Sequence, residues 1–127
     1  MNGIKLRGTG RAVPAGVVTN ADLARRMDTS DEWITSRTGI KRRDRGAAET
    51  HTDLCVRAAR AALERAGVSP ADIGACIVAT VTPDTVVPSA ACMLQRELGL
   101  PQDIPCFDLN AACTGFVYAL HTMECLL

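Results

Sequence analysis

The sequence predicts an α/β fold in which helices flank a mixed or parallel sheet. Two observations carry this prediction. Segments with the hydrophobic spacing of helices alternate with short apolar runs rich in β-branched residues, and this alternation is typical of strands joined by right-handed crossovers. The 127 residues are 47% hydrophobic and 22% charged, which suits one globular domain over residues 1–127.

The first 27 residues predict one short strand and one short helix. Residues 4–6 form an apolar strand candidate that ends at Gly8-Thr9-Gly10. A lone G-x-G is weak evidence for a nucleotide site, so we expect these glycines to let the backbone turn. Thr19 or Asn20 is a suitable N-cap for a helix that reaches Met27.

The following segment predicts a second short helix with a candidate binding surface. Residues 29–32 have the form of a capping box and open a helix that holds Trp33 and Arg37 one turn apart. A flat ring and a planar cation on one helix face suit an adenine base, but the residues alone favour a packing role for the single Trp. A basic cluster follows, which we interpret as a solvated face, with phosphates or an acidic carrier protein as alternative neighbours: Lys41, Arg42, Arg43 and Arg45.

The middle of the chain predicts alternating helices and strands. Thr50 or Thr52 suits the cap of the first helix, and Gly67 suits its end. The strands are continuous apolar runs, as expected for parallel strands covered on both faces. The predicted elements are a helix over 53–66, a strand over 75–81, a helix over 88–98 that starts at a proline, and a strand over 104–109.

Cys113 lies where the last predicted strand gives way to a new helical pattern. The strand stops at Leu109, and apolar residues recur at helical spacing from Cys113 onward. Ala111, Ala112 and Gly115 leave room beside the sulfur. Free backbone N–H groups and the positive end of the helix dipole favour the thiolate. A small cysteine that only packs is the alternative, but strand, small-residue turn and helix together favour a nucleophile.

The composition argues against several other classes of function. The six cysteines contain no C-x-x-C pair and are accompanied by two histidines, which argues against a zinc site and against a secreted disulfide framework. Fourteen basic residues balance fourteen acidic ones, so neither nucleic acid nor an anionic membrane is expected as a partner. The N-terminus shows no signal peptide and no apolar run approaches membrane-spanning length. We therefore expect a cytoplasmic protein without a metal or cofactor.

The segment from Asp108 to Phe116 resembles the active-site cysteine segment of the ketoacyl synthase III enzymes, which begin fatty-acid synthesis within the thiolase superfamily. Other stretches match this family in order and spacing, and their ordered sum is more specific than any one of them. They are Gly8-Thr9-Gly10 with Val13-Pro14, Thr19–Leu23, Asp28–Trp33, Arg37–Ile40, and Pro88–Cys92 with Gln95. The resemblance covers nearly the whole chain but only about the first third of such an enzyme.

The resemblance implies both a fold and an activity. Residues 1–127 would form the first βαβαβ half of a thiolase-like fold. Cys113 would accept an acyl group from acyl-CoA, and this acyl group would condense with malonyl-acyl carrier protein. In similar enzymes, the residues that match Thr29, Trp33 and Arg37 contact coenzyme A. Val87 stands where many relatives have a Phe that reaches the partner subunit's acyl pocket, and the complete enzyme would be a homodimer.

The acid–base partners of this chemistry are not visible in the sequence. His121 follows Cys113 by eight residues, which on one helix is roughly 12 Å and beyond hydrogen-bond reach. His51 precedes another helix, and Asn110 is expected to cap the Cys113 helix. In the family the catalytic His and Asn lie in the second half of the fold. We therefore expect a fragment that is inactive in full condensation and whose last helix exposes a second apolar face.

Two other interpretations remain open. The first is another thioester condensing enzyme, of the polyketide or hydroxymethylglutaryl-CoA synthase type; Asp28–Trp33 and Arg37–Ile40 favour the synthase III branch. The second is a non-catalytic domain that binds coenzyme A or a partner protein. The presence of Cys113 in its turn speaks against the second interpretation.

Overall fold

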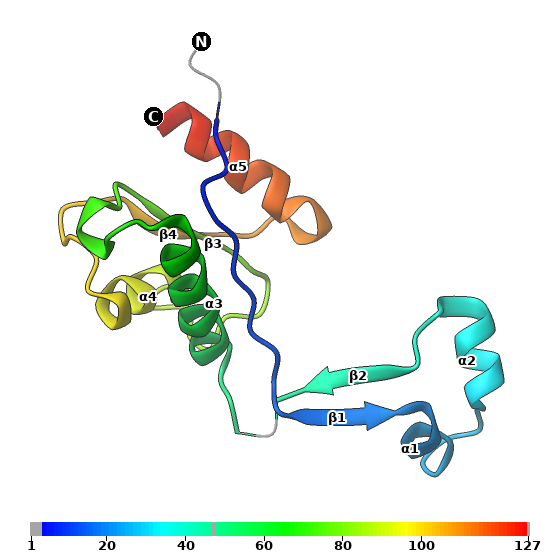
Figure 1. The fold of residues 1–127 in the computed structure, drawn as a ribbon. Coiled ribbons are helices and arrows are strands. Elements are labelled where there is room, and N and C mark those ends of the chain that lie inside the picture. Colours follow the sequence, from blue (N-terminus) through cyan, green and yellow to red (C-terminus); the bar gives the residue numbers. More distant parts are fainter. Residues whose placement is uncertain (1–3, 47, 127) are drawn as a thin grey trace. The chain divides into compact units, whose positions relative to one another are not determined.

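The computed structural model describes residues 4–46 and 48–126, and the chain divides into two compact units. Unit 1 comprises residues 1–12 and 50–127, and unit 2 comprises residues 13–49. Figure 1 shows the helices and strands of both units in chain order. No helix in the described ranges is long and apolar enough to cross a membrane.

Unit 1 contains a two-stranded parallel sheet. β3 (Cys76–Ala79) pairs with β4 (Cys106–Leu109). Between them in the chain, α4 (Ala90–Leu98) packs on both strands and on α3 (His51–Ala66), whereas α5 (Gly115–Leu126) packs on β3. The α/β prediction is confirmed, and so are the strands predicted over 75–81 and 104–109, although each is shorter than predicted. The buried core between these elements is small and apolar: Val56, Val78, Ala90, Ala91 and Leu94.

Local side-chain caps set the ends of α3 and α4. Thr50 accepts a hydrogen bond from the Asp53 backbone N–H, and the Asp53 carboxylate accepts one from the Thr50 N–H, at 3.0 Å each. This capping box selects Thr50, rather than Thr52, as the start of α3. Gly67 ends α3 with a left-handed φ of 62°. Ser89 caps α4, so this helix begins two residues later than predicted.

Two carboxylates from outside the helices reinforce these caps. Asp108 of β4 accepts hydrogen bonds from the first two N–H groups of α4, at 2.8 Å each. Asp84, in the loop after β3, accepts bonds from the first two N–H groups of α3, at 2.9 and 2.7 Å. Helix N-termini offer unpaired donors and a positive dipole end, so carboxylates are stabilising there. These bonds connect β4 to α4 and the β3–α4 loop to α3.

Between α3 and β3 the chain makes one 3-10 turn, Pro70–Asp72.

The N-terminal segment of unit 1 differs from the prediction. Residues 4–6 are not a strand; the segment runs beside α3 instead (Figure 1). Gly8 and Gly10 lie directly against the α3 backbone. A Cβ at Gly10 would overlap the Ala58 carbonyl oxygen and lie 2.6 Å from the Ala62 nitrogen. The glycines therefore permit close approach to a helix, and the expectation of a turn was wrong.

Unit 2 contains an antiparallel pair of strands that the sequence did not predict. β1 (Gly16–Thr19) pairs with β2 (Arg42–Arg45), with Gly16 opposite Arg45. β2 reads Arg-Arg-Asp-Arg and is mostly exposed, so it lacks the apolar alternation that usually reveals a strand. The basic cluster is therefore largely the second strand of this antiparallel pair.

The two helices of unit 2 are short. α1 (Asn20–Ala24) begins at a capping box formed by Thr19 and Asp22 and ends three residues before the predicted Met27. α2 (Asp31–Thr38) follows. Its N-cap is Ser30, whose hydroxyl accepts a bond from the Trp33 N–H at 3.0 Å. The expected capping box starting at Thr29 was wrong, because Ser30 occupies the cap position.

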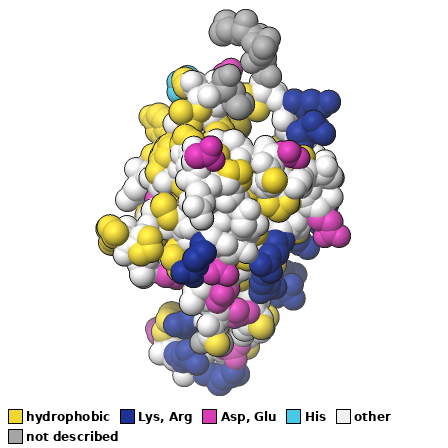
Figure 2. All heavy atoms as spheres, turned by 90° about the vertical axis from the view of Figure 1, so that its left-hand side faces the viewer, with side chains coloured by type: hydrophobic (Ala, Val, Ile, Leu, Met, Phe, Trp, Pro, Cys, Tyr) yellow, Lys and Arg dark blue, Asp and Glu magenta, His cyan; other side chains and the backbone are white. Residues whose placement is uncertain are grey.

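Helix α5 leaves much apolar surface exposed, as the sequence led us to expect. Phe116 is 73% exposed and Val117 is 65% exposed. Tyr118, Leu120 and Leu126 are exposed as well. Figure 2 shows hydrophobic side chains open to solvent on the face that it presents.

Candidate active site

Cys113 lies in a tight turn between β4 and α5. A 3-10 turn (Ala112–Thr114) leads directly into α5. The backbone N–H and the hydroxyl of Thr114 both donate to the Ala111 carbonyl, at 3.1 and 2.8 Å. Ala112 has a φ of 44°, a left-handed conformation that costs about 1–3 kcal/mol in a residue with a side chain. The strand-to-helix turn at Cys113 is therefore present, and its backbone is strained.

The surroundings of the turn leave the Cys113 side chain exposed to solvent. The start of α5 meets β3 closely: a Cβ at Gly115 would be in ordinary van der Waals contact with the Ala79 side chain, at 3.4 Å. The expected cap by Asn110 was wrong: Ala111 precedes the 3-10 turn, and no side-chain hydrogen bond caps it.

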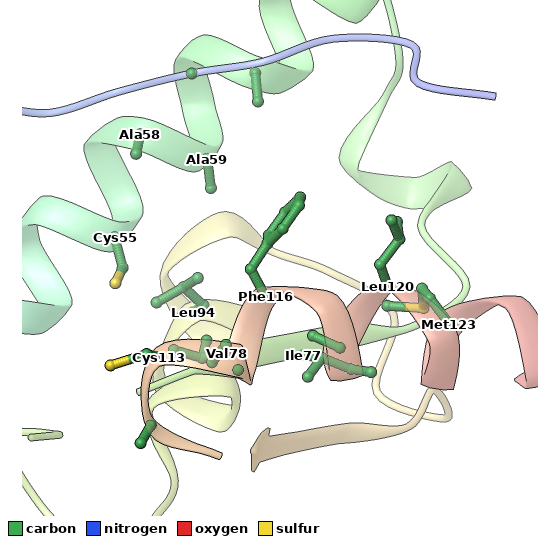
Figure 3. A pocket seen from close by; sticks show the side chains of 16 residues that line it. Cys55, Ala58, Ala59, Ile77, Val78, Leu94, Cys113, Phe116, Leu120 and Met123 are labelled. Carbon is green, nitrogen blue, oxygen red and sulfur yellow. The ribbon is translucent and has the colours of Figure 1, made fainter. Parts of the chain in front are cut away.

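An apolar hollow of about 890 Å³ adjoins Cys113. Its lining comes from α3, β3 and α5 and includes Cys55, Ile77 and Phe116. In Figure 3 Phe116 points from α5 toward α3, and the sulfurs of Cys55 and Cys113 lie at the same end of the hollow. The exposed thiol of Cys113 therefore borders a space lined mainly by hydrocarbon.

Five of the six cysteines fall into two groups by their surroundings. Burial raises the pKa of Cys76 to about 12. Burial also raises the pKa of Cys55 and of Cys106. These thiols stay protonated near neutral pH, which suits side chains that pack rather than react. Cys113 and Cys125 are instead exposed.

The two histidines each have another neighbour. His51 is the first residue of α3, and its ring lies 3.7 Å from the Cys55 sulfur. His121 lies on α5, 3.9 Å from both a Glu124 oxygen and the Cys125 sulfur. His51 therefore belongs to the N-terminal turn of α3 rather than preceding the helix. Among the described residues, no group of three or more His, Cys, Asp or Glu side chains could hold a metal ion.

The three predicted nucleotide contacts come together in unit 2. The Arg37 guanidinium carbon lies 4.6 Å from the centre of the Trp33 ring, which is cation–π distance. Trp33 is 53% exposed. Trp33 and Thr29 line the same surface hollow of about 480 Å³, together with residues 27, 28 and 30. This arrangement can bind a flat polar ring, because it combines the half-exposed indole of Trp33 with the stacked Arg37 cation and the Thr29 hydroxyl.

Val87 lies in the loop between β3 and α4. It is 85% exposed, and its neighbour Val86 is 87% exposed. The loop is braced internally by a bond of 2.9 Å from the Thr85 hydroxyl to the Pro88 carbonyl. The structure therefore presents Val87 at an apolar tip.

Asn20 is a residue that sequence reasoning treated only as a possible cap. Its side chain is buried, with 1% exposure, and carries four hydrogen bonds within unit 2. No local pattern reveals this role, because the hydrogen-bond partners of the Asn20 side chain are 11 to 23 residues away.

The chain matches no protein-family model. It is 49% identical over 122 residues to beta-ketoacyl-acyl-carrier-protein synthase III of Clostridium acetobutylicum, a match that covers 96% of this chain and 37% of the relative. The crystal structure of 3-oxoacyl-acyl-carrier-protein synthase III from Aquifex aeolicus superposes with a TM-score of 0.92 at 46% identity, over 97% of this chain and 40% of the other.

The resemblance to ketoacyl synthase III is confirmed. The chain spans a little more than a third of the length of the curated synthase III relatives that it matches. Its α/β fold is that of the corresponding part of the solved synthase III structures. A priming β-ketosynthase from the R1128 polyketide pathway also superposes, with a TM-score of 0.86 at 38% identity, over 93% of this chain and 35% of the other.

Proposed function

We propose that this chain is the part of a ketoacyl synthase III-type condensing enzyme that carries the acylated cysteine. The Cys113 thiolate attacks the carbonyl carbon of an acyl-CoA thioester, coenzyme A leaves as a thiolate, and the acyl group becomes bonded to the Cys113 sulfur. The observation that carries this proposal is the exposed Cys113 in a strained turn between β4 and α5. Relatives near 50% identity that are named for this activity support it.

The turn also suits the charge that develops during acyl transfer. The carbonyl oxygen becomes an oxyanion in the tetrahedral intermediate, and backbone N–H donors stabilise such an oxygen. We assign the backbone N–H of Cys113 as one donor. The apolar hollow beside Cys113 offers the acyl chain a hydrocarbon surface to pack against.

We further propose that Thr29, Trp33 and Arg37 bind the nucleotide of coenzyme A. The adenine stacks on the exposed part of Trp33, in the hollow that Thr29 shares. Arg37 supplies positive charge for a phosphate, and its stacking on Trp33 restricts the rotamers of both side chains. In this proposal coenzyme A enters as part of the acyl-CoA substrate.

The remaining part of the proposal concerns the complete enzyme. It is a cytoplasmic homodimer that condenses the acyl group on Cys113 with malonyl-acyl carrier protein. We assign the catalytic His and Asn to the part of the family's length that this chain does not span, because His51 and His121 have other neighbours. Val87 at its exposed tip is the residue that we assign to the partner subunit's acyl pocket.

The test is localised acylation of the purified chain by acetyl-CoA, read by intact mass. Cys125 provides a matched control, because it is also an exposed cysteine on α5. We expect Cys125→Ser to gain one acetyl group as fast as the parent chain, and Cys113→Ser to gain it much more slowly. Equal acylation of the two variants would refute the assignment of Cys113.

A second candidate function is priming of polyketide synthesis. The observation that favours it is the likeness to the R1128 priming β-ketosynthase. Acylation with a series of acyl-CoA lengths separates the candidates: a fatty-acid starter enzyme that prefers acetyl-CoA loads it fastest, and a polyketide-priming enzyme loads longer primers at least as fast.

A further inference from the structure

Unit 2 has almost no apolar core. Among its described residues only Asn20 and Ile34 are buried, at 1% and 6% exposure. A unit of this size cannot rely on burial of one Ile side chain for its internal order. The position of α2 must therefore depend strongly on polar contacts, and those of Asn20 are the most buried among them.

The Asn20 carboxamide joins three elements of unit 2. Its Nδ2 donates to Asp31 Oδ1 at 2.7 Å and to the Ile40 carbonyl at 2.8 Å. These two partners lie in the first turn of α2 and just beyond its end. Its Oδ1 accepts a bond of 2.6 Å from Arg43 Nη1 on β2. One side chain on α1 thus holds both ends of α2 and the strand next to β1.

The chemistry of this network requires an amide. An NH₂ group has two hydrogens, and the bonds to Asp31 and Ile40 use both, so the contact to Thr35 at 3.3 Å is a weaker third. Reversing the amide would set its oxygen against a carboxylate and a carbonyl, and its donors against a guanidinium. An Asp at this position has the same shape but would place two carboxylates together.

Trp33 and Arg37 both lie on α2, between the two ends that Asn20 holds. The first turn of α2 also follows directly on Thr29 and Ser30, which line the hollow beside Trp33. A shift of α2 would therefore move the indole, its stacked cation and the hollow together. Stacking on a ring is sensitive to such displacement, because it requires close parallel contact.

We propose that Asn20 is a positioning residue for nucleotide recognition: its buried carboxamide fixes α2 so that Trp33 and Arg37 present one preformed surface. Arg43, in the basic cluster, belongs to this network rather than to a solvated phosphate-binding face. This inference rests on the proposed function of Trp33 and Arg37. Asn20 touches no substrate itself and acts through α2.

The test compares Asn20→Asp and Asn20→Ala with Ser36→Ala in the 127-residue chain. Ser36 is the matched control, because it is exposed on α2 and makes one local bond to the Trp33 carbonyl. Three quantities are measured: amide hydrogen exchange in α2, coenzyme A affinity from the fluorescence of the single Trp, and the acylation rate of Cys113 against acetyl-CoA concentration.

We expect both Asn20 variants to exchange α2 amides about tenfold faster and to bind coenzyme A about tenfold more weakly. The acylation rate at saturating acetyl-CoA should stay at the parent value, because Cys113 lies in unit 1; only the concentration for half-maximal rate should rise. General unfolding would lower the saturating rate as well. Ser36→Ala should change none of the three quantities by more than about twofold.

Two results would overturn the inference. Parent-like exchange in α2 of Asn20→Asp would show that the carboxamide does not fix the helix. Faster exchange with unchanged coenzyme A affinity would show that the fixed position of α2 is irrelevant to recognition. Failure of the proposed function looks different: the parent chain's own Trp33 fluorescence would not respond to coenzyme A, and the exchange measurement would still decide whether Asn20 holds α2.

Discussion

Substitution of Gly10 by Ala tests how the N-terminal segment is held on α3. The added Cβ would overlap the Ala58 carbonyl oxygen and lie 2.6 Å from the Ala62 nitrogen, whereas ordinary contact begins at 3.4 Å. Both obstacles are helix backbone, which cannot rotate away as a side chain can. The segment must retreat from α3 by roughly 1 Å along its contact, with loss of close packing.

The expected cost of Gly10→Ala follows from that displacement. Overpacking of this kind costs about 1–3 kcal/mol, and the reduced freedom of the unfolded Ala chain returns about 0.4–1 kcal/mol. We therefore expect the free energy of unfolding of unit 1 to fall by about 1.3 kcal/mol and its melting temperature to fall by roughly 5–10 °C. The assay is thermal and urea unfolding followed by far-UV circular dichroism.

Gly74→Ala is the matched control for this prediction. No atom lies within 4 Å of a Cβ at Gly74, so this change should alter stability by less than about 0.5 kcal/mol. If Gly10→Ala melts like Gly74→Ala, the close approach to α3 is wrong. If Gly10→Ala instead lowers coenzyme A affinity without affecting stability, the Gly8-Thr9-Gly10 stretch has a ligand role that packing does not explain.

Three further predictions concern the helix caps and the acyl pocket. Asp108→Ala should lower the free energy of unfolding of unit 1 by about 2 kcal/mol in urea unfolding, because it leaves two N–H groups at the start of α4 without their acceptor. Asp108→Asn keeps one acceptor oxygen and should lose less stability. Equal losses in the two variants would contradict the capping role. Hydrogen bonds from threonine partners hold the pKa of Asp22, Asp53 and Asp84 below the usual 3.8. The stability that these ionised carboxylates contribute is therefore present above pH 4 and is lost as the pH falls through their lowered pKa values. In urea titrations between pH 7 and pH 2, Asp84→Asn should make the free energy of unfolding depend less on pH. An unchanged pH dependence in this variant would refute the contribution of Asp84. In a complete synthase with this segment, Val87→Phe should shift the preferred primer toward shorter acyl-CoA chains, and unchanged primer preference would remove Val87 from the acyl pocket.

Local signals in the sequence predicted the parts of the fold that are held locally. The box at Thr50 and the stop at Gly67 bracket α3, because caps involve residues only a few positions apart. The strand-to-helix turn at Cys113 was visible for the same reason. Trp33 and Arg37 were paired correctly, since helical spacing alone brings residues four apart together.

Features that depend on distant partners could not be predicted from the sequence in this way. β2 has no apolar alternation, and its partner β1 lies 26 residues earlier in the chain. The segment around Gly10 packs on a helix that begins some 40 residues later, so its glycines looked like a turn. Asn20 looked like a cap because its partners, Asp31, Ile40 and Arg43, are assembled only by the fold.

The central claim is that this chain recognises the nucleotide of acyl-CoA through Trp33 and transfers the acyl group to Cys113. The most direct measurement compares Cys113 acetylation by acetyl-CoA with that by acetyl-pantetheine, which has the same thioester but no nucleotide. We predict that acetyl-CoA reacts about tenfold faster at equal low concentration, and that Trp33→Ala removes this preference. Equal rates with both donors in the parent chain, or a preference that survives Trp33→Ala, would contradict the account.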